Sequence, residues 1–187
     1  DPPDPGQVMT GARGAQGAQG AWQTLAVVSL AQFLGMTLWF SATAVTPLLI
    51  TEFDIAPAHA AWLTMAVQAG FVAGTLLSAL SNIADILNAR VLMFIGSLTG
   101  AAANAAVLVA PGAMTLIGLR FLTGASLALV YPPAMKIAAG WFRDGRGFAL
   151  GLLIGALTLG KAFPHLLTAL FGAEWGEAML LPSGLGV

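Results

Sequence analysis

Charged residues are scarce in this chain. Asp, Glu, Lys and Arg make up 8% of its 187 residues, whereas apolar residues make up 58%. A water-soluble domain carries roughly 25% charged residues, and so few charges cannot coat the surface of a globule in water. The composition therefore excludes a soluble protein and predicts helices surrounded by lipid.

Several chemical signatures are also missing. Cysteine is absent, which excludes disulfides, thiolate zinc sites and thiol chemistry. The sequence lacks paired carboxylates, histidines at metal-ligand spacing, a Ser/His/Asp set and a phosphate-binding glycine loop. It has no basic stripe of the kind that binds nucleic acid. We therefore expect no enzyme, no cofactor, no metal site and no nucleic-acid partner.

The N-terminal segment differs from the rest. Residues 1–21, DPPDPGQVMTGARGAQGAQGA, have too few apolar side chains to pack, and they repeat Gly-Ala-Gln. This composition is typical of disorder, and the apolar run that follows is too long for a cleavable signal peptide. We expect residues 1–21 to form a disordered cytoplasmic tail. Because the chain starts with Asp and stops inside an apolar run, we also expect it to be a fragment of a longer protein.

Long apolar runs alternate with short polar segments over the rest of the chain. A helix needs about 20 apolar residues to cross a bilayer. The runs of sufficient length are 22–50, 60–80, 91–110, 114–140 and 148–171. The connections are too short to be domains. We predict an all-α, polytopic membrane bundle over residues 22–187, with five complete transmembrane helices and the start of a sixth.

Loop charges separate by sign. If the N-terminus is cytoplasmic, the cationic residues on that side are Arg13, Arg90, Lys136, Arg143 and Arg146. The acidic residues then on the other side are Glu52, Asp54, Glu174 and Glu177. The positive-inside rule favours this orientation. We expect a multi-pass protein of the inner cell membrane with a cytoplasmic N-terminus.

Glycines recur at helix-packing spacing. Small residues four apart lie on one helix face and let helix backbones approach closely in lipid. The candidates for such contacts are Gly70, Gly74, Gly124, Gly151 and Gly155. The alternative is that the spacing only reflects the abundance of glycine, because the chain contains 23 glycines.

Two cations lie inside apolar runs. Arg120 occurs in LIGLRFLTG, and Lys161 occurs in GALTLGKAFPHLL. An arginine at a helix centre costs at least about 2.5–3.5 kcal/mol on insertion scales, so Arg120 either faces a cavity inside the bundle or snorkels to the interface. The predicted spans contain no Asp or Glu. We therefore expect Arg120 and Lys161 to favour an anionic substrate, or to hold a titrating carboxylate supplied by another part of the protein.

Three further residues add polarity to the spans. Trp39 and Gln68 lie in the first and second spans, and Tyr131 precedes two prolines that interrupt the fourth. Proline removes a backbone donor, and such breaks are tolerated in membranes beside protein or water. We take these residues as candidates for lining a substrate cavity; the alternative is that they form ordinary interhelical hydrogen bonds.

A polar loop separates the second and third spans. It reads SALSNIADILNARVL, with Asp85 five residues before Arg90. By themselves these are two solvated loop charges. The stretch resembles the loop signature of the major facilitator superfamily, Gly-x-x-x-Asp-Arg-x-Gly-Arg-Lys, with Ser81 at the first glycine position, Asn88 at the second and Arg90 at the last basic position. The resemblance implies that Asp85 and Arg90 act as a cytoplasmic latch that opens when the transporter changes face.

Other positions strengthen the resemblance. Arg120 and Gly124 resemble the Arg-x-x-x-Gly motif of the family's fourth helix, and the glycines before Pro164 resemble its fifth-helix motif loosely. The family's fold implies two six-helix halves with substrate bound near the midplane between them. Residues 22–187 would then be most of the N-terminal half, with the lipid bilayer, a small solute and the C-terminal half as partners.

The function expected from the resemblance is secondary active transport. The solute would be small, with an anion favoured by the two intramembrane cations, and its movement would be coupled to an ion or proton gradient. The alternative is a membrane scaffold or assembly subunit that does not transport and is complete as five helices.

Overall fold

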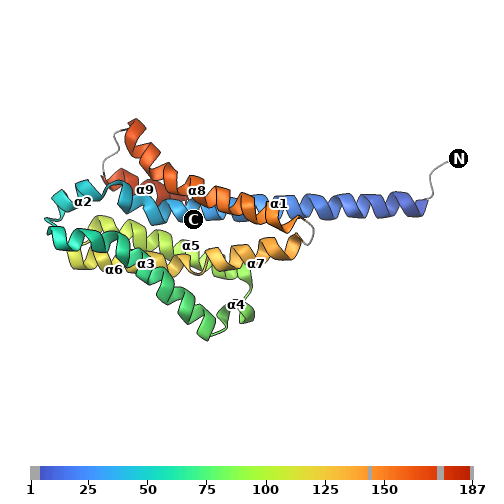
Figure 1. Cartoon of the computed structure of the whole chain (residues 1–187), viewed down its shortest axis with the longest axis horizontal. Coiled ribbons are helices and arrows are strands. Elements are labelled where there is room, and N and C mark those ends of the chain that lie inside the picture. Colours follow the sequence, from blue (N-terminus) through green and yellow to red (C-terminus); the bar gives the residue numbers. More distant parts are fainter. Residues whose placement is uncertain (1–4, 143–144, 172–174, 186–187) are drawn as a thin grey trace.

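The computed structural model describes residues 5–142, 145–171 and 175–185 (Figure 1). Within these ranges all regular structure is helical. The helices are α1 Pro5–Ala44, α2 Thr46–Glu52, α3 Pro57–Leu80, α4 Ile83–Ile86, α5 Ala89–Ala105, α6 Ala113–Leu127, α7 Tyr131–Trp141, α8 Arg146–Phe171 and α9 Trp175–Leu185, with a 3₁₀ turn at Ala106–Val109.

Five stretches of helix are long and apolar enough to cross a bilayer. They are Gly17–Ala44, His59–Leu80, Ala89–Val109, Ala113–Trp141 and Arg146–Leu170. Their order and length confirm the predicted polytopic bundle, and α9 is the start of the sixth predicted span. The first span ends at Ala44 rather than near Ile50, because the chain turns at Val45 and continues as the short helix α2.

The N-terminal helix is longer than the sequence suggests. α1 begins at Pro5, and its first turns project beyond the bundle (Figure 1). The structure thus continues the helix through most of the segment for which a disordered tail is expected. Alanine and glutamine are good helix formers, which explains why Gly-Ala-Gln repeats continue the helix. Disorder of residues 1–21 in water remains a prediction.

The fourth span is broken in the middle. α6 ends at Leu127, and α7 starts at Tyr131, with Pro132 and Pro133 in its first turn. A proline in the first turn of a helix loses no hydrogen bond, because the N–H groups there have no intrahelical partner. The prolines therefore begin a second helix that continues the span, and the predicted interruption is present.

Two helix pairs form the framework. α3 packs along α6, and α1 packs along α8 (Figure 1). α5 lies against α6, and α9 lies against both α1 and α5. Apolar side chains fill two clusters, one around Leu25, Val28 and Leu153 and the other around Leu49 and Met179.

Backbones approach most closely where α3 meets α6. A Cβ atom added to Gly124 would overlap the Val67 carbonyl oxygen, and one added to Gly70 would overlap the Phe121 carbonyl oxygen. At Gly74 an added Cβ would lie 2.7 Å from the Ala125 carbonyl oxygen. Only glycine fits at these three positions. The glycine of the Arg-x-x-x-Gly motif therefore forms part of the contact surface for α3.

Gly151 and Gly155 do not pack as expected. Both are exposed, and an added Cβ at either position would meet no described atom within 4 Å. The glycine that brings α8 against α1 is Gly160, where an added Cβ would overlap the Phe33 carbonyl oxygen. Nine residues separate Gly151 from Gly160, a rotation of about 180° at 3.6 residues per turn. The spacing predicted a small-residue stripe on α8, but the stripe lies on the face opposite the α1 contact.

Apart from Arg120 and Lys161, the charged side chains that the structure describes lie toward the two ends of the bundle. Asp85 pairs with Lys136 at one end, where Arg90 and Arg146 also lie beside α7. Glu52, at the end of α2, belongs to the opposite end. Arg143, Asp144 and Glu174 fall outside the described residues. This separation supports the predicted orientation, and the side of the membrane on which each end lies remains a proposal.

Candidate substrate cavity and the polar network behind it

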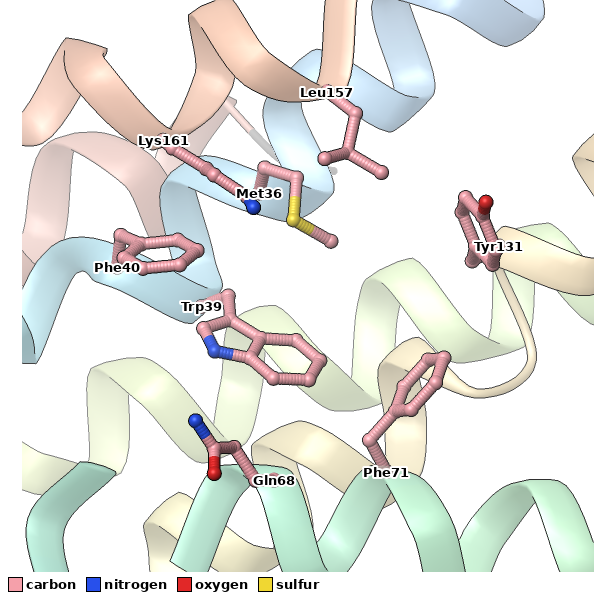
Figure 2. A pocket seen from close by; sticks show the side chains of 8 residues that line it. All are labelled: Met36, Trp39, Phe40, Gln68, Phe71, Tyr131, Leu157 and Lys161. Atoms are coloured by element: carbon pink, nitrogen blue, oxygen red, sulfur yellow. The ribbon is translucent and has the colours of Figure 1, made fainter. Parts of the chain in front are cut away.

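A cavity of about 290 Å³ opens between α1, α3, α7 and α8 (Figure 2). Four of the residues that the sequence proposed for a substrate site line it together: Trp39, Gln68, Tyr131 and Lys161. The other lining residues are Met36, Phe40, Phe71 and Leu157. The tertiary structure thus gathers residues from four helices that are distant in sequence.

Aromatic rings form a continuous wall of this cavity. The Trp39 ring stacks beside Phe40 with 6.3 Å between centroids and an interplanar angle of 22°. On the other side of Trp39, its ring centroid lies 5.2 Å from that of Phe71. The Phe71 centroid lies 6.4 Å from that of Tyr131. These separations are in the range of favourable ring contacts. The wall therefore runs from Phe40 on α1 to Tyr131 on α7.

Lys161 is the one charged side chain in the lining of this cavity. It extends from α8 toward α1 (Figure 2), and its Nζ lies 5.6 Å from the centroid of the Phe40 ring. This is a cation–π distance. The residue is exposed to the cavity opening. Lys161 therefore presents a positive charge at one end of the aromatic wall with no carboxylate beside it among the lining residues.

Arg120 does not line the cavity, in contrast to our prediction. Its side chain is completely buried, which also rules out the snorkelling alternative in this structure. Nη1 donates to the Leu38 carbonyl at 3.2 Å, and Nη2 donates to the Trp39 carbonyl. Arg120 thus lies behind Trp39 and holds the α1 backbone, while the Trp39 side chain faces the cavity. The physical reason is that α1 crosses α6 at this level and covers the guanidinium.

A second partner of Arg120 is the amide of Asn104 on α5. Asn104 Oδ1 accepts from Arg120 Nη1 at 2.9 Å and from Ser41 Oγ at 3.1 Å. Its Nδ2 donates to the Met179 carbonyl and to Ser183 Oγ, both at 3.1 Å. All these hydrogen bonds are buried. Asn104 therefore connects α1, α5, α6 and α9 through one side chain.

Uncharged polar groups take the place of a carboxylate partner for Arg120, since the spans contain no Asp or Glu. Within the described part of the chain, no carboxylate reaches Arg120, and its charge is balanced by carbonyl and amide dipoles. Its Nε has no hydrogen-bond partner. In the sequence, Asn104 is one polar residue in the apolar run 91–110. No signal in the sequence pairs it with Arg120, because the two lie on different helices.

A separate hydrogen bond supports Tyr131. The buried Gln32 Nε2 donates to the Tyr131 carbonyl at 3.3 Å. This contact joins α1 to the first residue of α7, just after the break in the fourth span. Gln32 thereby helps to fix the backbone from which the Tyr131 ring enters the cavity.

The predicted latch has a different partner. Asp85 pairs with Lys136 of α7, with 2.6 Å between Oδ1 and Nζ, and Lys136 also donates to the Ala84 carbonyl at 3.1 Å. Arg90, the partner suggested by the family pattern, makes no ion pair among the residues described. The reason is that α4 ends at Ile86 and Leu87 is extended, which separates Arg90 from Asp85. The Asp85 contact therefore links α4 to α7 within this part of the chain.

Asn88 fills a local role at the position where the family pattern has glycine. Its side-chain Oδ1 accepts from the Arg90 backbone N–H at 2.9 Å and caps α5. Asparagine is among the best N-cap residues. The departure from the pattern is therefore compensated by a helix cap.

We expect Lys136→Gln to have little effect on stability. The side chains of Lys136 and Asp85 are 56% and 74% exposed, and exposed ion pairs contribute roughly 0–1 kcal/mol. The melting temperature of the full-length protein should stay within about 2 °C of that of the unmodified protein. Thermal unfolding of both proteins tests this. A large loss of melting temperature would show that the ion pair is structural.

Known proteins resemble this chain over most of its length. The family model described as Major Facilitator Superfamily matches residues 28–187. A multidrug efflux pump, LfrA of Mycolicibacterium smegmatis, is 28% identical over 165 residues, which is 86% of this chain and 32% of the pump. The chain thus spans about a third of the length of this curated relative.

Proposed function

Because the chain belongs to the major facilitator superfamily, we propose that it forms the N-terminal half of a secondary active transporter. The observation that carries the proposal is the cavity itself, which brings Trp39, Gln68, Tyr131 and Lys161 together from four helices. In such transporters, substrate binds near the midplane and alternating access exposes it to each side. A scaffold would need no such cavity.

We propose that the solute is small and carries negative charge. Lys161 is the cation of the cavity, and its lining contains no Asp or Glu. Opposite charges attract more strongly near a protein surface than in bulk water, so Lys161 favours an anion. Arg120 does not contribute to this site, because its guanidinium is occupied by the buried network.

Coupling, direction and location complete the proposal. An ion or proton gradient drives the movement, and the relative's description as an efflux pump supports export. Cations near Asp85 and acids near Glu52 support a cytoplasmic N-terminus in the inner cell membrane.

The central test is reconstitution of the full-length protein in liposomes, where an imposed pH gradient should drive accumulation of labelled organic anions. Equal accumulation after the pH gradient is collapsed with a protonophore would refute proton coupling.

We expect Lys161→Gln to raise the KM for an anionic solute about tenfold or more, as one lost charge-assisted contact predicts. The melting temperature should hardly change, since the described contact of Lys161 is an exposed cation–π pair. Lys161→Arg should recover most of the affinity. The matched control is Arg146→Gln, which removes an exposed cation outside the cavity lining. An unchanged KM in Lys161→Gln would contradict the assignment of the anion site.

A further inference from the structure

The two ends of the cavity differ in chemistry. The Lys161 Nζ lies at the Phe40 end, whereas Phe71 and Tyr131 line the other end (Figure 2). Between them Trp39 contributes the largest ring. The apolar residues Met36 and Leu157 cover the side nearer α1 and α8. The cavity therefore offers one charged pole and one aromatic pole to whatever binds it.

From this polarity we infer that the transported solute is an aromatic anion: a flat ring that contacts Trp39, Phe71 and Tyr131, with its negative group at Lys161. This inference rests on the proposed transport function and adds the ring to it. Aromatic walls favour flat π systems through offset or edge-to-face contacts that aliphatic groups of the same size cannot make. Organic cations are disfavoured, because Lys161 repels them and no lining residue is acidic.

The described contact of the charged pole is the cation–π pair between Lys161 and Phe40. In the structure the ammonium lies 5.6 Å from the Phe40 centroid. Such a contact at an exposed site is weaker than a charge-assisted hydrogen bond. A carboxylate can therefore compete with Phe40 for Lys161.

The part of the cavity that this chain forms has a volume of about 290 Å³. This is just below the roughly 300–1,000 Å³ of complete small-molecule pockets, so it can hold the ring and the negative group of a small aromatic anion. Gln68 adds a neutral amide that can bind one further polar substituent.

Three matched probes test the inference on the unmodified full-length protein in lipid nanodiscs. They are naphthoate, its saturated analogue decahydronaphthoate, and the cation naphthylmethylammonium. We expect naphthoate to bind roughly fivefold more tightly than the saturated anion, as one or two ring contacts predict. We expect it to bind at least about tenfold more tightly than the cation, because like charges repel at a binding site. Isothermal titration calorimetry measures all three. Equal affinity of the two anions, tighter binding of the cation, or no binding of naphthoate would overturn the inference.

A variant tests which ring causes the preference for naphthoate over its saturated analogue. Phe71→Leu keeps an apolar side chain but removes a ring, so the ratio of the naphthoate and decahydronaphthoate affinities should fall toward one. Phe163→Leu is the control, because Phe163 packs against Phe33 at 5.3 Å and lies outside the cavity lining. The control should keep the full ratio. A preserved ratio in Phe71→Leu would overturn the placement of the ring.

Failure of the inference and failure of the proposed function give different results. If the reconstituted protein moves another labelled anion and naphthoate does not compete, the aromatic inference is wrong and the transport function stands. If naphthoate binds with the expected preference but no anion moves under an imposed gradient, transport is wrong and the binding site stands.

Discussion

Gly124→Ala is expected to destabilise the transporter by about 3 kcal/mol, near the upper end for an overpacked core. The added methyl carbon would overlap the Val67 carbonyl oxygen and lie 3.0 Å from the Phe71 backbone nitrogen. Both atoms belong to the backbone of α3, so no side-chain rotation can relieve the contact. α3 must move away from α6 and take Gln68 and Phe71 of the cavity with it. The melting temperature of the purified full-length protein and its yield from the membrane measure the effect.

Gly151→Ala is the matched control for this prediction. It makes the same chemical change at a position of α8 where an added Cβ meets no described atom within 4 Å. Alanine also has a higher helix propensity than glycine. We expect its melting temperature to equal or exceed that of the unmodified protein. If Gly124→Ala and Gly151→Ala behave alike, close approach of α3 and α6 does not control stability.

Arg120→Ala is expected to cost about 2–4 kcal/mol of stability and to leave substrate affinity nearly unchanged. Three hydrogen bonds are lost, to Asn104 and to the carbonyls of Leu38 and Trp39. Buried hydrogen bonds of charged groups contribute roughly 1.5–3 kcal/mol in water-soluble proteins and less between membrane helices, about 0.6 kcal/mol on average. The acceptors left behind are buried, so water cannot replace the guanidinium. Thermal unfolding gives the stability, and titration of folded protein with naphthoate gives the affinity.

Lys161→Gln is the comparison variant for Arg120→Ala. Arg120→Ala should lower the melting temperature and shift the naphthoate Kd by less than about threefold, which corresponds to under 1 kcal/mol. Lys161→Gln should leave the melting temperature nearly unchanged and weaken naphthoate binding. A normal melting temperature combined with a large loss of affinity in Arg120→Ala would show that Arg120 belongs to the substrate site, as the sequence predicts.

Composition was sufficient to predict the class of fold. Lipid is the only solvent that tolerates so many apolar residues with so few charges, and each apolar run is long enough for a helix that crosses a bilayer. Within the span from Ala113 to Trp141, the sequence also located the break, because proline lacks the backbone donor that an uninterrupted helix requires. These are local properties, and the five described spans confirm them.

The candidate site could be predicted only in part. Trp39, Gln68, Tyr131 and Lys161 were identifiable because polar or amphipathic side chains are unusual in apolar runs, and all four line one cavity. Phe40 and Phe71 were not identifiable, because phenylalanine in a membrane helix gives no sign of whether it faces lipid, protein or a cavity. Their roles in binding remain predictions.

Other features depend on helix rotation and on contacts between distant segments. The sequence by itself determined that the chain spans a membrane, that the fourth span breaks at its prolines, and which face of each helix carries glycine or charge. Only the tertiary structure decided that Arg120 lies behind Trp39, that Asp85 pairs with Lys136, and that α8 meets α1 through Gly160. A buried charge must find partners, because it is costly in lipid without them. Which groups supply them is set by how the helices cross.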